Sequence, residues 1–169
     1  MYGTSPIELM ACAAMMNRQV YCYGFNYSAQ WFGATALGAN GTVSVPTQIT
    51  ADSDFVIQRM NLVTFSAVGT KVVDPDFTLI LTIAGNAVNL MDQAQPVVNI
   101  CGNFSANVVQ NDLPFPILIP ANNTLNATLV NRTAVAQNLT QLTYTGFKVK
   151  YLQNQDGTPT SRQQVFNVL

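Results

Sequence analysis

The carboxylates that could serve as a catalytic or metal-binding pair occur two residues apart, at Asp52/Asp54 and at Asp74/Asp76. The chain contains no histidine, so the commonest general base and metal ligand are missing. A calcium loop needs more oxygen ligands at regular spacing and a bidentate glutamate, and none follows either pair. We therefore expect these aspartates to cap turns, and we expect no enzymatic activity and no metal site.

The cysteines Cys12, Cys22 and Cys101 show no CxxC spacing. Such a set favours buried free thiols that pack as small hydrophobic side chains. The alternative is a single bridge, for which Cys22 and Cys101 are the best pair. Glycine-rich nucleotide-binding motifs are missing as well, so the sequence predicts no cofactor.

Aromatic side chains alternate along residues 19–27, where a strand would place Tyr21, Tyr23, Phe25 and Tyr27 on one face. With Trp31 these tyrosines could form a platform that stacks against a carbohydrate or a base. The alternative is that the row belongs to the core or to an interface between proteins, which is the commoner use of such rings.

The clearest architectural signal lies between Leu113 and Arg132. Prolines 114, 116 and 120 remove backbone donors and restrict the first half to an edge strand or a connection. Asn122 and Asn123 favour a turn, after which apolar and polar residues alternate as in a half-buried strand. Residues 77–83 alternate in the same way and, with Gly85 and the residues after it, predict a hairpin. We predict an all-β fold, an antiparallel β-sandwich of jelly-roll-like form.

Two strands carry unusual patterns. Residues 55–67 have apolar side chains on both parities, which predicts a strand covered on both faces, with Phe55, Ile57, Val63 and Phe65 on one face. Near the end, the apolar parity changes at Gly146, and this predicts a β-bulge in the last strand, with Lys148 and Lys150 facing outward.

The ends of the chain differ from the middle. Ser5, Pro6 and Glu8 predict the start of a helix that runs to about Asn17 and is apolar nearly all round. A polar linker precedes an apolar tail at 165–169. We therefore divide the chain into an N-terminal arm with a short helix (1–18), a β-sandwich domain (19–152) and an extended C-terminal arm (153–169).

The composition is poor in charge. Charged residues make up 9% of the chain, against about 25% in an average domain, and the formal net charge is −1. No basic stripe is present for nucleic acid, and no apolar run is long enough for a spanning helix. The first residues lack the basic region of a signal peptide. These features favour a protein made in a reducing cytoplasm that contacts neither nucleic acid nor membrane and hides much of its surface in an assembly.

The order of motifs resembles a group of virion β-sandwich proteins of tailed bacteriophages. The similar elements are Thr50-Ala-Asp-Ser-Asp-Phe55, the aliphatic segment 79–83, the segment 114–124, then 129–133 and Gly146-Phe147-Lys148. The resemblance covers roughly residues 45–152 and involves no catalytic residues. It implies a capsid decoration (cement) protein, or a collar, tail or baseplate component of similar fold.

From these observations we expect a structural virion protein that stabilises a capsid lattice, with the major capsid protein or neighbouring virion proteins as partners and with homo-oligomers as its form. The alternative is a carbohydrate-binding sandwich that uses the aromatic platform. The candidate subunit contacts are the apolar side chains of the two arms: Ile7, Leu9, Met10, Met15, Met16, Val165, Phe166, Val168 and Leu169.

Overall fold

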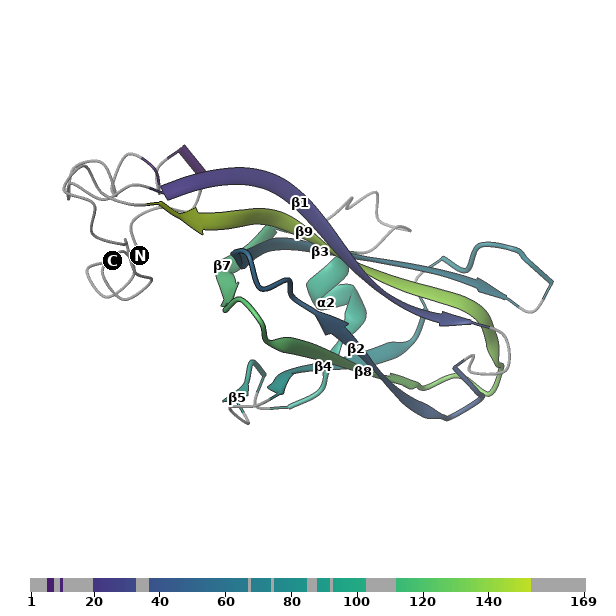
Figure 1. The fold of residues 1–169 in the computed structure, drawn as a ribbon. Coiled ribbons are helices and arrows are strands. Elements are labelled where there is room, and N and C mark those ends of the chain that lie inside the picture. Colours follow the sequence, from purple (N-terminus) through teal and green to yellow (C-terminus); the bar gives the residue numbers. More distant parts are fainter. Residues whose placement is uncertain are drawn as a thin grey trace.

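The computed structural model describes residues 6–7, 10, 20–32, 37–66, 68–73, 75–84, 88–91, 93–102 and 112–152. Its strands and helix follow one another along the chain (Figure 1). They are β1 (Val20–Phe32), β2 (Thr42–Gln48), β3 (Asp54–Ser66), β4 (Phe77–Ala84), β5 (Val88–Asn89), β6 (Gln95–Pro96), α2 (Val97–Cys101), β7 (Asp112–Ile119), β8 (Thr124–Asn131) and β9 (Gln137–Tyr151).

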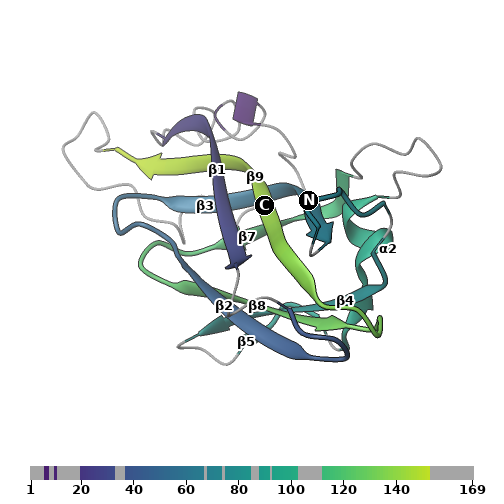
Figure 2. The same ribbon diagram turned by 90° about the vertical axis from the view of Figure 1, so that its right-hand side faces the viewer.

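The strands pair in a nested order. The first strand pairs with the last (β1 with β9), the second with the last but one (β2 with β8) and β3 with β7, and β4 pairs with both β5 and β6, all antiparallel. β9 also pairs with β3, which completes a four-stranded sheet in the order β1-β9-β3-β7. β8 also pairs with β4, which completes a five-stranded sheet in the order β2-β8-β4-β5, with β6 as the fifth strand beside β4. The two sheets face each other (Figure 2). Nested antiparallel pairing in two sheets is the jelly-roll arrangement, so the predicted all-β sandwich is confirmed.

The core lies between the sheets because apolar residues alternate with polar ones along the strands. In β4 and β8 every second side chain is buried, as both sequence patterns predicted. The other sheet contributes inward-facing residues of β3 and β9. The largest fully buried side chains are Trp31, Tyr144, Phe55, Phe77, Phe147, Leu37, Ile49, Ile57, Met60, Leu79 and Leu81.

The proline-rich stretch lies where the sequence indicated. β7 is the last strand of its sheet, so Pro114 and Pro116 occupy an edge. After Pro120 the chain turns at Asn122, which has φ 65°, and enters β8 in the opposite sheet. Asparagine tolerates this left-handed backbone better than most residues do. The turn therefore passes the chain from one sheet to the other.

The predicted bulge exists, but it lies on a different strand. The register between β1 and β9 runs without a break, whereas Ile57 faces Gly146 and Arg59 faces Thr145 across the β3–β9 pair. The extra residue is Gln58 of β3, so the prediction of a bulge at Gly146 of β9 is wrong. A second register shift, between Phe65 and Ser66, lies at the other end of this strand pair. The apolar pattern of β9 changes at Gly146 for another reason: Leu142 and Tyr144 face the main core, whereas Phe147 and Val149 are buried on the other face of the sheet.

Gln58 also changes which residues of β3 face the core. Phe55 and Ile57 point inward before the bulge, and Met60 and Leu62 point inward after it. The predicted grouping of residues by simple alternation is therefore wrong. Val56 faces the other side of the sheet, where it packs with Val20, Phe147 and Val149 in a second buried cluster. The expectation of burial on both faces thus holds at this end of β3.

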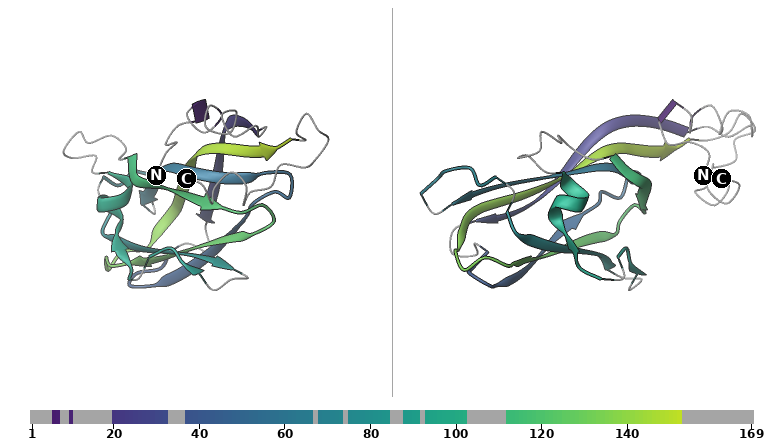
Figure 3. Two further views of the ribbon diagram at one scale, coloured as in Figure 1. Left: turned by 90° about the vertical axis from the view of Figure 1, so that its left-hand side faces the viewer. Right: turned by 180° about the vertical axis from the view of Figure 1, so that it is seen from behind.

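The connection between β4 and β7 contains an element that the sequence analysis missed. Helix α2 buries Val97, Ile100 and Cys101 and contacts β3 of one sheet and β4 of the other (Figure 3). Of the predicted N-terminal helix, Pro6, Ile7 and Met10 are helical, and its remaining residues lie outside the described part of the chain.

Asn131, at the end of β8, holds together the loops beside it. Its side chain is fully buried, and Nδ2 donates to the carbonyl oxygens of Val135 (2.9 Å), Gly38 (3.0 Å) and Leu37 (3.4 Å). Its Oδ1 accepts from the backbone N–H (3.0 Å) and the hydroxyl (2.7 Å) of Thr133. One buried amide side chain thus links the backbone at residues 37–38 to the backbone at residues 133–135.

Candidate functional site

The aromatic row of β1 is present and runs from the core to the surface. Because β1 and β9 keep one register, Tyr21, Tyr23, Phe25 and Tyr27 share the face that carries Tyr144 of β9. Tyr27 packs against the core, with its ring centroid 4.9 Å from that of Phe55. Toward the start of the strand the rings are open to solvent, and 37% of Phe25 and 52% of Tyr21 are exposed.

Trp31 does not belong to this surface, so its assignment to the platform is wrong. Its side chain is 1% exposed and lies in the main core. It has the same parity as the tyrosines, but it lies near the other end of β1 and packs in the main core. β2 of the facing sheet contacts β1. Position along the strand, and not the face alone, therefore decides which rings meet water.

The exposed rings contact each other in pairs. The centroids of Tyr21 and Tyr23 are 5.8 Å apart with an interplanar angle of 32°, and those of Phe25 and Tyr27 are 4.8 Å apart at 55°. Offset and tilted rings at such distances stabilise one another. The ring planes of Tyr21 and Tyr23 are thus closer to parallel than those of Phe25 and Tyr27.

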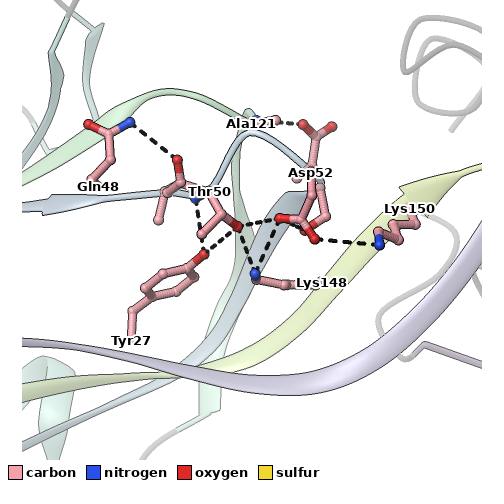
Figure 4. A network of polar contacts seen from close by, with 10 residues as sticks. Tyr27, Gln48, Thr50, Asp52, Ala121, Lys148 and Lys150 are labelled. Atoms are coloured by element: carbon pink, nitrogen blue, oxygen red, sulfur yellow. Dashed lines mark hydrogen bonds and ion pairs between the residues drawn. The ribbon is translucent and has the colours of Figure 1, made fainter.

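A polar cluster borders the row and is centred on Thr50 (Figure 4). The Thr50 hydroxyl donates to Asp52 Oδ1 and accepts from Lys148 Nζ at 2.7 Å. Tyr27 and Thr50 exchange two hydrogen bonds: the Tyr27 hydroxyl lies 3.1 Å from Thr50 Oγ1 and accepts from the Thr50 backbone N–H at 3.2 Å. If the Tyr27 hydroxyl donates to Thr50 Oγ1, that oxygen accepts from Tyr27 and Lys148 while its own hydrogen goes to Asp52, so the four hydrogen bonds are compatible.

Lys148 faces inward, so the prediction that it faces outward is wrong. Its side chain is only 5% exposed, and Nζ lies 4.2 Å from the centre of the Phe25 ring and 5.5 Å from that of Tyr27. Burial lowers the pKa of Lys148, but interactions with Tyr27 and Asp52 outweigh it, and the net shift is upward. Lys148 is therefore a buried cation held by rings and a carboxylate.

Asp52 carries the negative charge of the cluster. It lies 3.5 Å from Lys148 Nζ and 3.6 Å from Lys150 Nζ, and the side chains of Asp52 and Lys150 are each 44% exposed. The hydrogen bond from Thr50 is the largest cause that holds the pKa of Asp52 well below its usual value, and Lys148 adds to it. An ionised carboxylate and an ammonium group thus lie side by side at the edge of the aromatic row.

Asp52 and Asp54 do not act as a pair. Asp54 is buried and accepts from the Ala121 backbone N–H and from the Tyr151 hydroxyl, both at 2.6 Å. The hydrogen bond from Ala121 ties the start of β3 to the turn between β7 and β8. The capping role expected for the aspartates therefore applies to Asp54, whereas Asp52 joins the cluster of Lys148. Asp74 lies outside the described residues.

The cysteines and the arm residues complete the list of predicted sites. Cys22 and Cys101 are unpaired, so the alternative of a bridge between them is wrong, and burial raises their pKa values to about 11 and about 12. Among the predicted subunit contacts, Ile7 is 79% and Met10 38% exposed. The others, together with Cys12, lie outside the described residues: Leu9, Met15, Met16, Val165, Phe166, Val168 and Leu169.

Within the described ranges, no group of three or more histidine, cysteine or acidic side chains is arranged to hold a metal ion. The helices of the same ranges include none that is long and apolar enough to cross a membrane. Sequence reasoning missed the polar cluster of Thr50, Asp52, Lys148 and Lys150. The pairing of the first strand with the last, which sets Lys148 opposite Tyr23, is the signal that could have revealed it.

Comparison with known proteins gives a distant structural likeness. No protein-family model matches the sequence, and no curated protein matches it. Among solved structures, the VP2 subviral particle of infectious bursal disease virus aligns with 78% of this chain at 16% identity and a TM-score of 0.32. The chain covers 32% of the length of that protein.

Proposed function

We propose that this protein is a structural component of a virion, which binds and stabilises a capsid lattice as a decoration protein and has no catalytic role. Its partners would be further copies of this chain and the major capsid protein or neighbouring virion proteins. It would be made in the host cytoplasm and would act in the virion, away from nucleic acid and membrane.

The observation that carries this proposal is the edge formed by β1. Exposed sheet edges offer unpaired backbone groups to other chains, and monomeric proteins block them with prolines, charges, bulges or short strands. The other edges have such devices: β7 contains prolines and borders the bulge, β5 and β6 have two residues each, and β2 contains Pro46. β1 has 13 residues, with neither a charged residue nor a proline.

Low charge supports the same proposal. A net charge of −1 creates little repulsion between copies packed side by side. Within the described ranges, large apolar side chains are exposed at Ile7, Met10, Val68, Val73, Val135 and Leu152 as well as on β1. Burial of apolar area contributes about 25 cal/mol per Å², so contacts shared among several neighbours would add up to a stable lattice.

The test is the state of assembly of the purified chain. Light scattering after size-exclusion chromatography, over a wide concentration range, should give masses that are multiples of 18.3 kDa, and electron microscopy should show ordered particles or sheets. Ser28→Lys places a charge at an exposed position of β1 and should shift the mass toward the monomer.

Asn138→Lys is the matched control, because Asn138 is also exposed but lies on β9, outside the residues that pair with β1. It should leave the mass distribution unchanged. A chain that remains at 18.3 kDa at the highest concentration, and whose mass Ser28→Lys does not alter, would contradict assembly through β1.

A further inference from the structure

The solvent-exposed end of the aromatic row, at the start of β1, has side chains that suit the binding of a small ligand. Tyr21, Tyr23 and Phe25 project from one face of β1 at successive inward positions, and Tyr21 and Phe25 are more than one-third exposed. Lys148 Nζ already lies over the Phe25 ring. The rings left to meet a ligand are therefore chiefly those of Tyr21 and Tyr23, whose planes are closer to parallel than those of Phe25 and Tyr27.

Hydrogen-bonding groups of both kinds lie beside these rings. The pairing of β1 with β9 sets Lys150 opposite Tyr21 and Lys148 opposite Tyr23. Lys150 and Asp52 are each 44% exposed, so Lys150 offers donors and Asp52 offers acceptor lone pairs at the surface. Thr50 and the buried Lys148 hold the Asp52 carboxylate in place, which limits the ordering that a ligand would have to impose.

We propose that Tyr21, Tyr23, Asp52 and Lys150 form a binding site for a neutral oligosaccharide. Sugar rings present C–H groups that suit the electron-rich faces of aromatic rings, and their hydroxyls both donate and accept hydrogen bonds. Tyr21 and Tyr23 provide the faces, Asp52 accepts from hydroxyls, and Lys150 donates to them. The site does not depend on the proposed virion role.

The charges favour a neutral ligand over an anionic one. Lys148 and Lys150 both lie within 4 Å of the Asp52 carboxylate, at 3.5 and 3.6 Å. Neither ammonium group is therefore an unpaired cation aimed at a phosphate or a sulfate, which is what affinity for a nucleic-acid backbone or an acidic glycan requires. Neutral hydroxyls can join this ion pair without the cost of breaking it.

The experiment is a calorimetric titration of the purified chain with cellohexaose, chitohexaose and mannohexaose, with a heparin hexasaccharide as the acidic comparison. At least one neutral oligosaccharide should bind saturably and more tightly than the heparin fragment. Tyr21→Ala should weaken that binding about fivefold or more, because it removes a stacking face. Tyr21→Phe, which keeps the ring, should bind about as well as the wild type.

Two controls separate this site from other effects. Val135→Ala shortens a side chain that is 59% exposed on the loop before β9, at the end of the β1–β9 pair that lies away from Tyr21, and should leave the affinity unchanged. Ser28→Lys should alter assembly but not sugar binding, so a failure of either proposal would be seen separately. Tyr21 is half exposed, so Tyr21→Ala should retain the thermal stability of the wild type.

Two outcomes would overturn the proposal. One is that none of the three neutral oligosaccharides binds saturably; if Tyr21→Ala then also lowers the oligomeric mass, the row is an interface between proteins. The other is that a sugar binds, but Tyr21→Ala binds it with unchanged affinity.

Discussion

Gly146→Ala should destabilise the protein more than its size suggests. A Cβ at residue 146 would lie 1.8 Å from the carbonyl oxygen of Val56, 2.9 Å from its carbonyl carbon and 3.2 Å from Cα of Ile57. All three atoms belong to the backbone of β3, so no rotation of a side chain relieves the overlap. β3 is paired with β9 on one side and β7 on the other, so any shift of the bulge would disturb both ladders.

The expected cost is at least about 3 kcal/mol, the upper end of the range for overpacked sites, because backbone must move. For a domain of this size that corresponds to a fall in melting temperature of about 10 °C. Urea unfolding followed by the fluorescence of the buried Trp31 should show a lower midpoint with an unchanged slope.

Gly24→Ala is the matched control. Gly24 lies on the neighbouring strand, opposite Phe147, and a Cβ there meets no atom within 4 Å. We expect it to change the free energy of unfolding by less than about 1 kcal/mol. If Gly146→Ala unfolds within about 0.5 kcal/mol of the wild type, the proposed fit between Gly146 and the Gln58 bulge is incorrect.

Two further predictions concern buried and paired polar groups. Asn131→Ala should cost about 3 kcal/mol in urea unfolding, since it removes five hydrogen bonds made by a fully buried side chain. The exposed Asn138→Ala should cost less than about 0.5 kcal/mol, and equal losses would contradict this role for Asn131. The pKa of Asp52 is lowered in the folded state, so its contribution to stability is present above the unfolded value of 3.8 and is lost as the pH falls toward the folded-state pKa. The difference in melting temperature between the wild type and Asp52→Asn should therefore shrink below about pH 4, and a difference that grows there would contradict the assignment.

The sandwich brings together two features that suit different tasks. In the two proposals, β1, the last strand of its sheet, pairs with a neighbouring chain, and the rings at its start bind a ligand. An edge and a face of one strand can be used at the same time, since hydrogen bonds to a neighbour lie in the plane of the sheet and side chains stand perpendicular to it. A virion protein built in this way could assemble through β1 and still hold a saccharide.

Local patterns determined the fold class and much of the strand assignment. Alternation in β4 and β8 marks their inward residues, and the prolines of β7 confine it to an edge, whatever the rest of the chain does. The Asn122 turn is equally local, since it depends on the tolerance of one residue for positive φ. These features are visible in sequence because each depends on neighbours within a few positions.

Only the tertiary structure decided which residues of the candidate site meet each other and which meet water. Thr50 and Lys148, joined by a hydrogen bond, are 98 positions apart in the chain, and the extra residue of the bulge is placed by pairing between β3 and β9. Trp31 and Tyr21 share a face, yet one is 1% and the other 52% exposed. Burial at a given position depends on where the opposite sheet covers the strand, and that is a property of the packed sandwich that alternation along β1 cannot express.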